Sequence, residues 1–205
     1  MTEKVLDAIK KLKEQKKRNF SQTFDLVVNL TSLDLKKPES KINEEFRLPN
    51  GWGDDSKVGI FSDAMKNLSG AEIINSGEIE RLGKDKSSAK KLVKKIDFFL
   101  AEAKLMPSVG KALGQLLAPR GRMPKMFSGD PNQFVDTLRK SVRIRIKDSP
   151  VIQCKVGKEN MKDEDVAENV KAVVKYLETR LPKGKSNIDK LWLKLTMSEP
   201  MQVEV

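Results

Sequence analysis

At both ends of the chain, apolar and polar residues alternate in the pattern that is typical of half-buried β-strands. Apolar side chains occupy every second position in residues 23–30, 141–146 and 188–195, and mostly polar residues lie between them. Because successive side chains of a strand point to opposite faces, each segment is expected to bury one face and expose the other. Weaker segments of the same kind cover residues 42–48, 149–156 and 200–205. Since 149–156 follows 141–146 directly, the two are expected to pair as a hairpin.

Two segments carry the period of an amphipathic helix instead. Residues 163–180 have Asp163 as the expected N-cap, acids in the first turn and Arg180 at the end, in agreement with the helix dipole. Residues 3–18 place apolar side chains on one face and lysines on the opposite face. Such a helix can lie on a membrane surface or pack on a sheet of its own protein. The narrow apolar stripe, which lacks large aromatic residues, favours packing.

Between these ends the pattern changes to short apolar runs that alternate with helical segments. The runs are KVGIF, AEIIN and IDFFLAE, and helices are expected at residues 62–70, 76–83, 84–95, 106–117 and 130–140. Short buried strands joined by helices form a parallel sheet that is covered on both faces. We therefore expect an α+β domain built from both chain ends (1–48 and 141–205), interrupted by an inserted α/β domain (49–140). Two separate outer units fit the same pattern.

The charge of the chain adds an expectation about partners. Lys and Arg number 40 against 29 Asp and Glu, which gives a net charge of +11 and a pI of about 9.6. Such a chain is attracted to polyanions. Nucleic acid is the first candidate because neutralised phosphates release counterions, an anionic membrane is the second, and a merely solvated surface is the third. The basic residues of the outer segments form the expected phosphate footprint: Lys17 and Arg18 at the end of the first helix, Arg143, Arg145 and Lys147 along one strand face, and Lys183 and Lys185.

Candidate catalytic chemistry is scarce in the sequence. There is no histidine, and the single cysteine, Cys154, falls in an alternating strand segment, so a disulfide within the chain and a Cys/His zinc site are excluded. The Gly110-Lys111 pair lacks the preceding glycine and the following Ser or Thr of a phosphate loop. We expect no enzyme activity, no cofactor and no metal. A Mg²⁺ site at the acids of GDD or DEDVAE is the minor alternative. No secretory signal or apolar membrane-spanning window is visible.

One segment, VGKALGQLLAPRGRMPK, resembles the signature of the universal large-subunit ribosomal protein of the mobile stalk (the L-one family). The family form has Gly-Pro-Arg-Gly before an apolar residue and Met-Pro. Here Ala118 replaces the first glycine and Arg122 replaces the apolar residue, but the spacing is intact. RNFSQTFDLVVNLTSLDLKKPE resembles the archaeal and eukaryotic branch, and KVGKENM and LKLTM resemble later blocks. The four blocks stand in the family's order and cover almost the whole chain.

The resemblance implies an α+β RNA-binding domain made from both ends and an inserted three-layer, Rossmann-like domain without nucleotide chemistry. It also implies a cytoplasmic protein on the ribosome that binds structured large-subunit ribosomal RNA at the stalk, near the tRNA exit site. Assistance in the release of deacylated tRNA, and repression of translation through its own messenger RNA, are further implied roles. The protein is expected to be a monomer when free and not to bind membranes. The alternative is an α/β enzyme or nucleotide-binding protein that acts on an anionic ligand.

The resemblance also implies the RNA-contacting positions. The expected contacts with ribosomal RNA are Arg18, Phe20, Thr23, Asp25, Gly157, Lys158, Lys190, Thr196, Met197 and Ser198. Ser198 stands where the family has glycine, and serine restricts the backbone conformation at this position more than glycine would. Without the resemblance, Phe20 and Met197 would be interpreted as core residues. In the signature, Pro119, Gly121 and Pro124 are expected to shape the chain after a helix, and a secondary RNA contact is expected at Arg120, Arg122 and Lys125.

Overall fold

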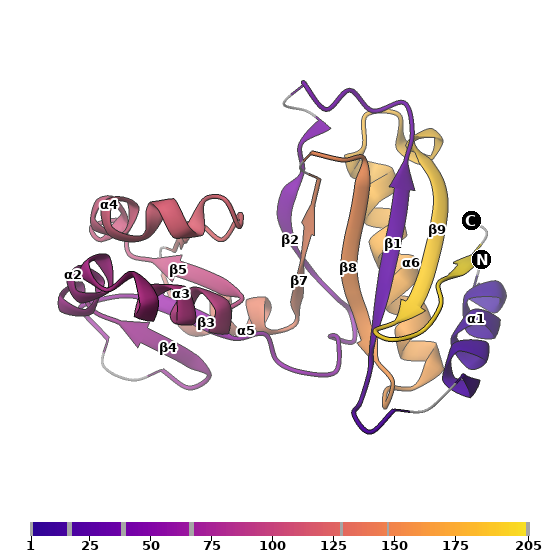
Figure 1. Cartoon of the computed structure of the whole chain (residues 1–205), viewed down its shortest axis with the longest axis horizontal. Coiled ribbons are helices and arrows are strands. Elements are labelled where there is room, and N and C mark those ends of the chain that lie inside the picture. Colours follow the sequence, from indigo (N-terminus) through magenta and orange to yellow (C-terminus); the bar gives the residue numbers. More distant parts are fainter. Residues whose placement is uncertain are drawn as a thin grey trace. The chain divides into compact units, whose positions relative to one another are not determined.

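The computed structural model describes residues 2–15, 18–37, 40–65, 68–127, 129–146 and 148–203 (Figure 1). The chain forms two compact units, one from Met1–Asp55 and Lys140–Val205 and the other from Ser56–Arg139. We call the first the end-built unit and the second the insert. Each combines helices with β-sheet, as the hydrophobic pattern predicts. Within the described residues, no helix has both the length and the apolar character that a membrane crossing needs.

The end-built unit contains an antiparallel four-stranded sheet in the order β10-β9-β1-β8. Its strands are β1 (Thr23–Leu30), β8 (Val151–Lys158), β9 (Ile188–Leu195) and β10 (Met201–Val203). Every second side chain of β1 is buried, so the sheet has one buried face and one open face. The helix α6 (Asp163–Arg180) lies behind the sheet in Figure 1, and no described helix lies over the face that is turned to the viewer.

The first helix, α1 (Thr2–Glu14), packs on the same core. Its residues Val5, Ile9 and Leu12 are buried among side chains of the sheet and of α6, so the prediction of packing within the protein is confirmed. The helix ends four residues before Arg18, and the prediction that Arg18 closes it is therefore wrong. Residues 13–19 contain no apolar side chain, so a longer helix would have nothing to bury. Lys17 lies outside the described residues.

A separate two-stranded sheet pairs β2 (Asn43–Arg47) with β7 (Ser141–Arg145). The predicted hairpin between residues 141–146 and 149–156 is wrong: β7 pairs with β2, β8 pairs with β1, and the two strands belong to different sheets. Arg143 lies opposite Glu45, with 3.8 Å between Nη2 and Oε1, and the two side chains are only 17% and 13% exposed. Arg143 is therefore not exposed for phosphate binding, contrary to the prediction of a row of cations on this strand face. Lys147 lies outside the described residues.

The clearest predicted helix, α6, has the expected bounds, but its N-cap is Lys162 rather than Asp163. Asp163 instead accepts a hydrogen bond of 2.6 Å from Lys13 Nζ, which joins α1 to α6. Asn169 is fully buried in α6. Its Nδ2 donates to the Gly51 carbonyl at 2.6 Å, and its Oδ1 accepts from the Asn50 N–H at 3.1 Å. These bonds attach residues 49–55, which were expected in the insert, to the end-built unit.

The insert is built on a parallel sheet in the order β4-β3-β5-β6. Its elements are β3 (Val58–Phe61), β4 (Ala71–Ile74), α2 (Ser76–Lys84), α3 (Lys86–Lys95), β5 (Phe98–Ala101), α4 (Met106–Leu117), β6 (Lys125–Met126) and α5 (Pro131–Arg139). Buried side chains of α2, α3 and α4 form one core on this sheet, and those of α5 form another. The parallel sheet agrees with the prediction from the short apolar runs.

The helix expected at residues 62–70 is absent from the described part of that segment, which forms bends and a turn. Asp63 and Ala64 are exposed, so the segment offers no continuous apolar face that could hold a helix on the sheet. Gly70 has φ of +86°, a conformation that ends the loop before β4.

Candidate nucleic-acid interface

The ends of three neighbouring strands bring several of the predicted RNA-binding residues together. Thr23 begins β1, Gly157 and Lys158 end β8, and Thr196 follows the last residue of β9. In the register, Thr23 lies opposite Lys158 and Phe24 lies opposite Gly157. Three segments that are far apart in the sequence therefore meet at one end of the sheet, which we call the strand-end surface.

Hydrogen bonds fix the turn that follows β9. The Thr196 Oγ1 accepts from the Thr23 N–H at 3.2 Å and donates to the Thr23 carbonyl at 3.4 Å. The Ser198 Oγ accepts from the Leu195 N–H at 2.7 Å, and the Ser198 N–H donates to the Leu195 carbonyl at 3.1 Å. Ser198 does not adopt a positive φ, so the backbone here needs no glycine. The hydroxyl instead provides a bond that glycine could not make.

Gln22, which the sequence analysis missed, holds the other side of this turn. Its side-chain oxygen accepts from the Met197 N–H at 3.1 Å. Its backbone N–H donates to a Glu159 carboxylate oxygen at 3.2 Å, and its carbonyl accepts from the Glu159 N–H at 2.9 Å. Gln22 shares the parity of Phe24 and is 3% exposed, so extending the alternation of β1 by one position would have marked it as inward-facing.

Two large apolar side chains remain exposed next to these polar contacts. Phe20 is 52% exposed and Met197 is 58% exposed, so the interpretation of both as core residues is wrong. Met197 also lines an open hollow of about 280 Å³ together with Gln15, Gln22, Leu195, Ser198 and Glu199. Exposed apolar side chains beside hydrogen-bonding groups are suited to contact a base or a ribose.

The loop of residues 50–54 supports Lys158 at the end of β8. The Lys158 ammonium forms an ion pair with Asp54 and lies 6.0 Å from the centre of the Trp52 ring, and the Lys155 ammonium lies 4.1 Å from the same ring. Gly53 has φ of +96°, and a Cβ there would meet the Lys158 Cβ at 2.9 Å. The loop therefore requires glycine at residue 53, both for its backbone conformation and for its approach to Lys158.

Asp25 lies on the open face of the sheet between two lysines. The register places it opposite Lys155 on β8 and Lys194 on β9. Partial burial raises the pKa of Asp25, although the two ammonium groups act in the opposite direction. Lys190 is also on the open face, opposite Asn29. It is four residues from Asp25 along the ladder, about 13 Å, so it does not belong to the strand-end surface.

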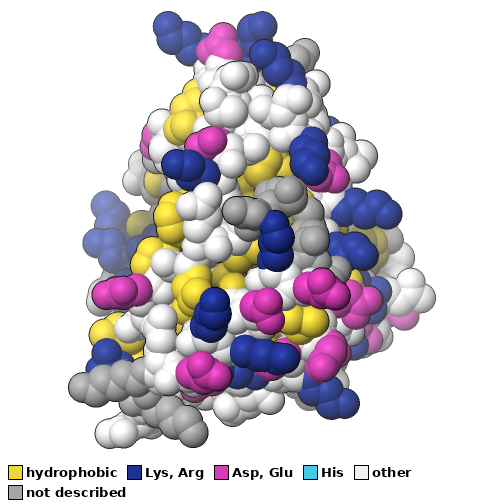
Figure 2. Space-filling model, turned by 90° about the vertical axis from the view of Figure 1, so that its right-hand side faces the viewer, with side chains coloured by type: hydrophobic (Ala, Val, Ile, Leu, Met, Phe, Trp, Pro, Cys, Tyr) yellow, Lys and Arg dark blue, Asp and Glu magenta, His cyan; other side chains and the backbone are white. Residues whose placement is uncertain are grey.

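The remaining predicted cations of the end-built unit are spread out. Arg18 is exposed in the segment that leads to Phe20 and β1. Lys183 and Lys185 are exposed around the short 3-10 helix Gly184–Asn187, before β9. Figure 2 shows one side of the molecule, on which basic and acidic side chains are interspersed rather than separated. Among the residues that the structure describes, that side therefore shows no single large cationic field (Figure 2).

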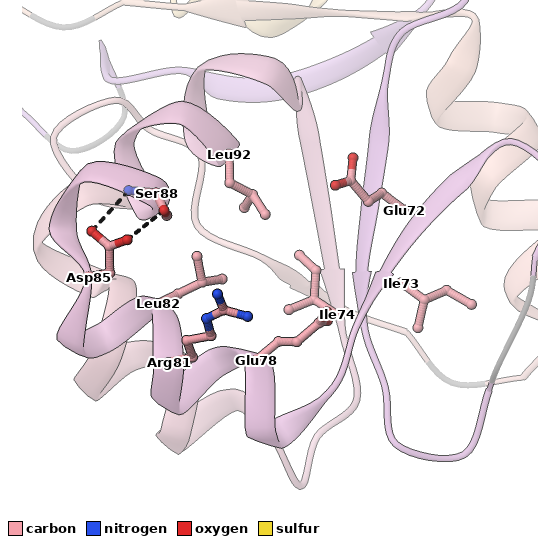
Figure 3. A pocket seen from close by; sticks show the side chains of 9 residues that line it. All are labelled: Glu72, Ile73, Ile74, Glu78, Arg81, Leu82, Asp85, Ser88 and Leu92. Carbon is pink, nitrogen blue, oxygen red and sulfur yellow. Dashed lines mark hydrogen bonds between the residues drawn. The ribbon is translucent and has the colours of Figure 1, made fainter.

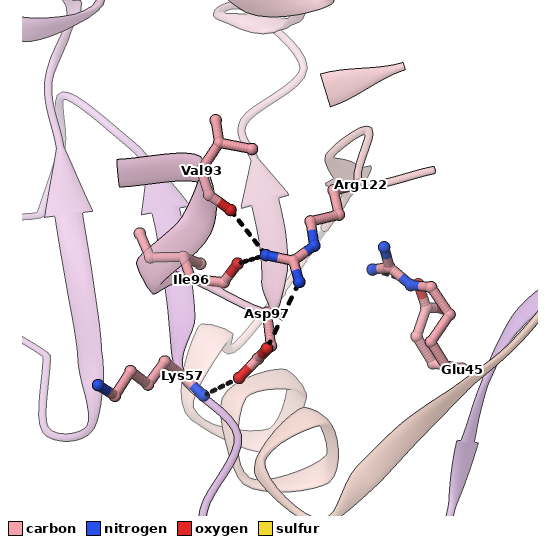
Figure 4. Close-up of polar contacts among 7 residues, drawn as sticks. Glu45, Lys57, Val93, Ile96, Asp97 and Arg122 are labelled. Carbon is pink, nitrogen blue, oxygen red and sulfur yellow. Dashed lines mark hydrogen bonds and ion pairs between the residues drawn. The ribbon is translucent and has the colours of Figure 1, made fainter. Parts of the chain in front are cut away.

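The signature segment folds back on the insert that contains it. Gly121 has φ of +65°, and its N–H donates to the Ala118 carbonyl at 2.9 Å, so the predicted turn geometry is confirmed. The Arg122 guanidinium donates to the carbonyls of Val93 and Ile96 at 2.6 and 2.5 Å, and it lies 3.8 Å from an Asp97 carboxylate oxygen (Figure 4). Arg122 thus binds the C-terminal end of α3. Arg120 and Lys125, the other two predicted secondary contacts, are exposed.

The insert has a hollow of its own, of about 170 Å³, between α2, α3 and β4 (Figure 3). It is lined by Glu72, Ile73, Ile74, Glu78, Arg81, Leu82, Asp85, Ser88 and Leu92. Three carboxylates against one guanidinium do not suit an anionic ligand. None of the predicted site residues lies there.

Two observations on the described residues concern nucleophilic chemistry and metal binding. Burial raises the pKa of Cys154 to about 12, so its thiol is not a nucleophile near neutral pH. Among the residues that the structure describes, no three or more Asp, Glu, Cys or His side chains are grouped to hold a metal ion.

Comparison with known proteins identifies the family of the chain. Residues 12–199 match the model of the ribosomal protein L1p/L10e family. The chain is 43% identical to the large ribosomal subunit protein uL1 of Methanobrevibacter smithii, over 99% of this chain and 100% of the relative. It is 40% identical to the protein of the same name from Pyrococcus horikoshii, over 98% of this chain and 96% of the relative. The chain therefore belongs to the ribosomal protein L1p/L10e family, whose members are ribosomal proteins and not enzymes.

Proposed function

We propose that this protein is a component of the large ribosomal subunit and that its strand-end surface binds structured ribosomal RNA of the stalk. The observation that carries the proposal is the exposure of Phe20 and Met197 beside the hydrogen-bonded ends of β1, β8 and β9. Folded RNA is recognised through its shape, its 2′-hydroxyls and its unstacked bases, and this surface offers apolar, hydroxyl and ammonium groups together. The names of the relatives, which place them in the large subunit, support the same assignment.

The end-built unit is the RNA-binding domain in this proposal. Eight of the ten proposed contacts lie at the strand ends or in the segment that enters β1, and Asp25 and Lys190 extend the footprint along the open face of the sheet. Lys158, supported by Asp54 and Trp52, provides a charge for a phosphate. The secondary contact is confined to Arg120 and Lys125, because Arg122 is engaged by α3.

We further propose that binding near the tRNA exit site assists the release of deacylated tRNA. The same surface would bind a segment of the protein's own messenger that imitates the ribosomal RNA, and would thereby repress translation. A single surface serves both RNAs, so they should compete for it. Competition between the stalk RNA and the messenger leader, measured with the purified protein, tests this second role, and simultaneous binding of both RNAs would contradict it.

The test of the main proposal is alanine substitution of the two exposed apolar residues. Phe20→Ala and Met197→Ala should each weaken binding to a stalk ribosomal RNA fragment by about 1–2 kcal/mol, roughly five- to thirty-fold. Their melting temperatures should change little, because neither side chain is buried. Phe134→Ala, at a 40% exposed phenylalanine on α5, is the matched control and should leave the affinity unchanged. Equal affinity of the two variants and the wild-type protein would contradict the proposed site.

A further inference from the structure

The insert carries more net charge per residue than the end-built unit. Residues 56–139 contain 15 Lys and Arg against 9 Asp and Glu, a net charge of +6, and the rest of the chain contains 25 against 20, a net charge of +5. A strand-end site does not account for this excess, because it lies in the other unit. One element of the insert stands out. The ten residues of α3 contain the five lysines Lys86, Lys90, Lys91, Lys94 and Lys95, and no acid.

Four of these lysines form a continuous cationic surface. Ala89 and Val93 are buried and mark the side of α3 that packs on the insert. At 3.6 residues per turn, the lysines fan out over the remaining half of the helix, and all of them are exposed. Lys95 has a carboxylate partner, Glu72, at 2.6 Å. We therefore define the α3 lysine face by the other four, Lys86, Lys90, Lys91 and Lys94, which extend over about 12 Å of helix.

Helix stability does not explain this composition. Lys86 lies in the first turn, where the helix dipole disfavours a positive charge. Lys90 is four residues from both Lys86 and Lys94, and like charges at this spacing repel each other. The helix is held from its ends instead. Asp85 accepts hydrogen bonds from the Ser88 N–H and the Ser88 hydroxyl (Figure 3). It also accepts one from the Ser87 N–H.

The opposite end of α3 is fixed by the signature segment. Arg122 binds the carbonyls of Val93 and Ile96, which would otherwise lack helical partners (Figure 4). A helix with fixed ends can present repelling charges without unfolding. Phosphates that neutralise such a row of charges remove the repulsion, so their binding is favourable.

We propose that the α3 lysine face is a second RNA-binding surface, which takes the phosphate backbone of a double-stranded RNA independently of sequence. The exposed Ser87 hydroxyl lies among the lysines and can donate to a phosphate oxygen. The helix contains no aromatic residue, so it has no platform on which single-stranded bases could stack. This surface goes beyond the strand-end site and lies in the other unit of the chain.

The test compares two full-length variants of equal charge. One replaces the α3 lysine face (K86Q/K90Q/K91Q/K94Q). The control replaces four exposed lysines of α1 and α6 (K10Q/K11Q/K171Q/K175Q). The probe is a double-stranded RNA of about two helical turns with no ribosomal sequence. The α3 variant should bind it at least tenfold more weakly at low salt, and its slope of log K against log salt should be smaller by about 3, whereas the control should change little.

Two further measurements complete the test. In the wild-type protein, the duplex should protect the α3 lysines from acetylation more than the four control lysines, a result that does not require any variant to fold. Met197→Ala should keep duplex binding while it loses affinity for the stalk fragment, which separates this proposal from the strand-end site. Equal loss of duplex binding in both lysine variants, unchanged binding in the α3 variant, or equal protection of both lysine sets would overturn the proposal.

Discussion

The Thr196 side chain is hydrogen-bonded within the protein and is also exposed to solvent. Its hydroxyl bonds to both backbone groups of Thr23, yet the residue itself is exposed at the strand-end surface. Valine keeps the β-branched shape of threonine but removes the bonds that join the ends of β1 and β9.

We therefore predict that Thr196→Val lowers both stability and RNA affinity. The loss of the Thr23 bonds should reduce the free energy of unfolding by about 0.5–1.5 kcal/mol. Thr196→Ser keeps the hydroxyl and should restore most of both quantities. Denaturant titration and RNA binding of the two variants check this. If serine and valine lowered RNA affinity equally, the hydroxyl would not be the group that matters.

Tyr176 gives a prediction about pH. It lies on α6, where its hydroxyl donates to a Glu44 carboxylate oxygen and its ring centre is 4.7 Å from that of Phe46. Burial, reinforced by the bond to Glu44, raises the pKa of Tyr176 to about 12. The folded protein therefore keeps the phenol proton at pH values where the unfolded chain, with an ordinary pKa of about 10, loses it.

This contribution to stability is complete below about pH 10 and disappears as the pH approaches 12. We predict that the free energy of unfolding falls more steeply between pH 10 and 11.5 in the wild-type protein than in Tyr176→Phe. Lysine titration is common to both proteins and cancels in the comparison. Denaturant titrations over this range provide the measurement, and parallel curves would show that Tyr176 titrates normally in the folded state.

At the scale of elements, local patterns predict strands and helices but not how they pair. The alternation in β1 and β9 and the amphipathic period of α6 are local, and these elements appear where they were expected. The partner of β7 is not a local property. The nearest strand in sequence is β8, but β7 pairs with β2, almost a hundred residues away. The two-residue strand β6 was missed because so short a segment has no period.

Arg122 belongs to the signature segment and links that segment to helix α3. We predict that Arg122→Lys lowers the free energy of unfolding of the insert by about 1–2 kcal/mol, because lysine cannot bond both α3 carbonyls with the geometry of a guanidinium. Binding to the stalk fragment should remain unchanged, since the insert is not the main contact. Arg81→Lys, at an exposed arginine of α2 outside the proposed RNA contacts, is the control and should change neither quantity. A loss of RNA affinity in Arg122→Lys without a loss of stability would return Arg122 to the RNA contacts.

At the scale of the whole molecule, the change from alternating strands to short apolar runs predicts where the chain leaves one unit for the other. It places the first crossing near residue 48, whereas the structure places it after Asp55. The difference arises from Asn169, a buried polar residue whose bonds to Asn50 and Gly51 no sequence period reveals. The strand-end residues could be named only through the family resemblance, because Phe20 and Met197 look like core residues in the sequence.

The end-built unit should fold and bind RNA without the insert. Residues 1–55 joined to 140–205 by a short flexible linker keep the four-stranded sheet, both of its helices and the Trp52 loop. The same design with residues 1–48 and 141–205 loses Trp52 and two partners of Asn169, the Asn50 N–H and the Gly51 carbonyl, so it should be less stable. We predict that the longer design melts cooperatively and keeps most of the affinity for the stalk fragment, while its binding to unrelated duplex RNA falls because α3 is absent. Circular dichroism melting and the two RNA titrations check this. A folded end-built unit that bound neither RNA would place the main contact in the insert.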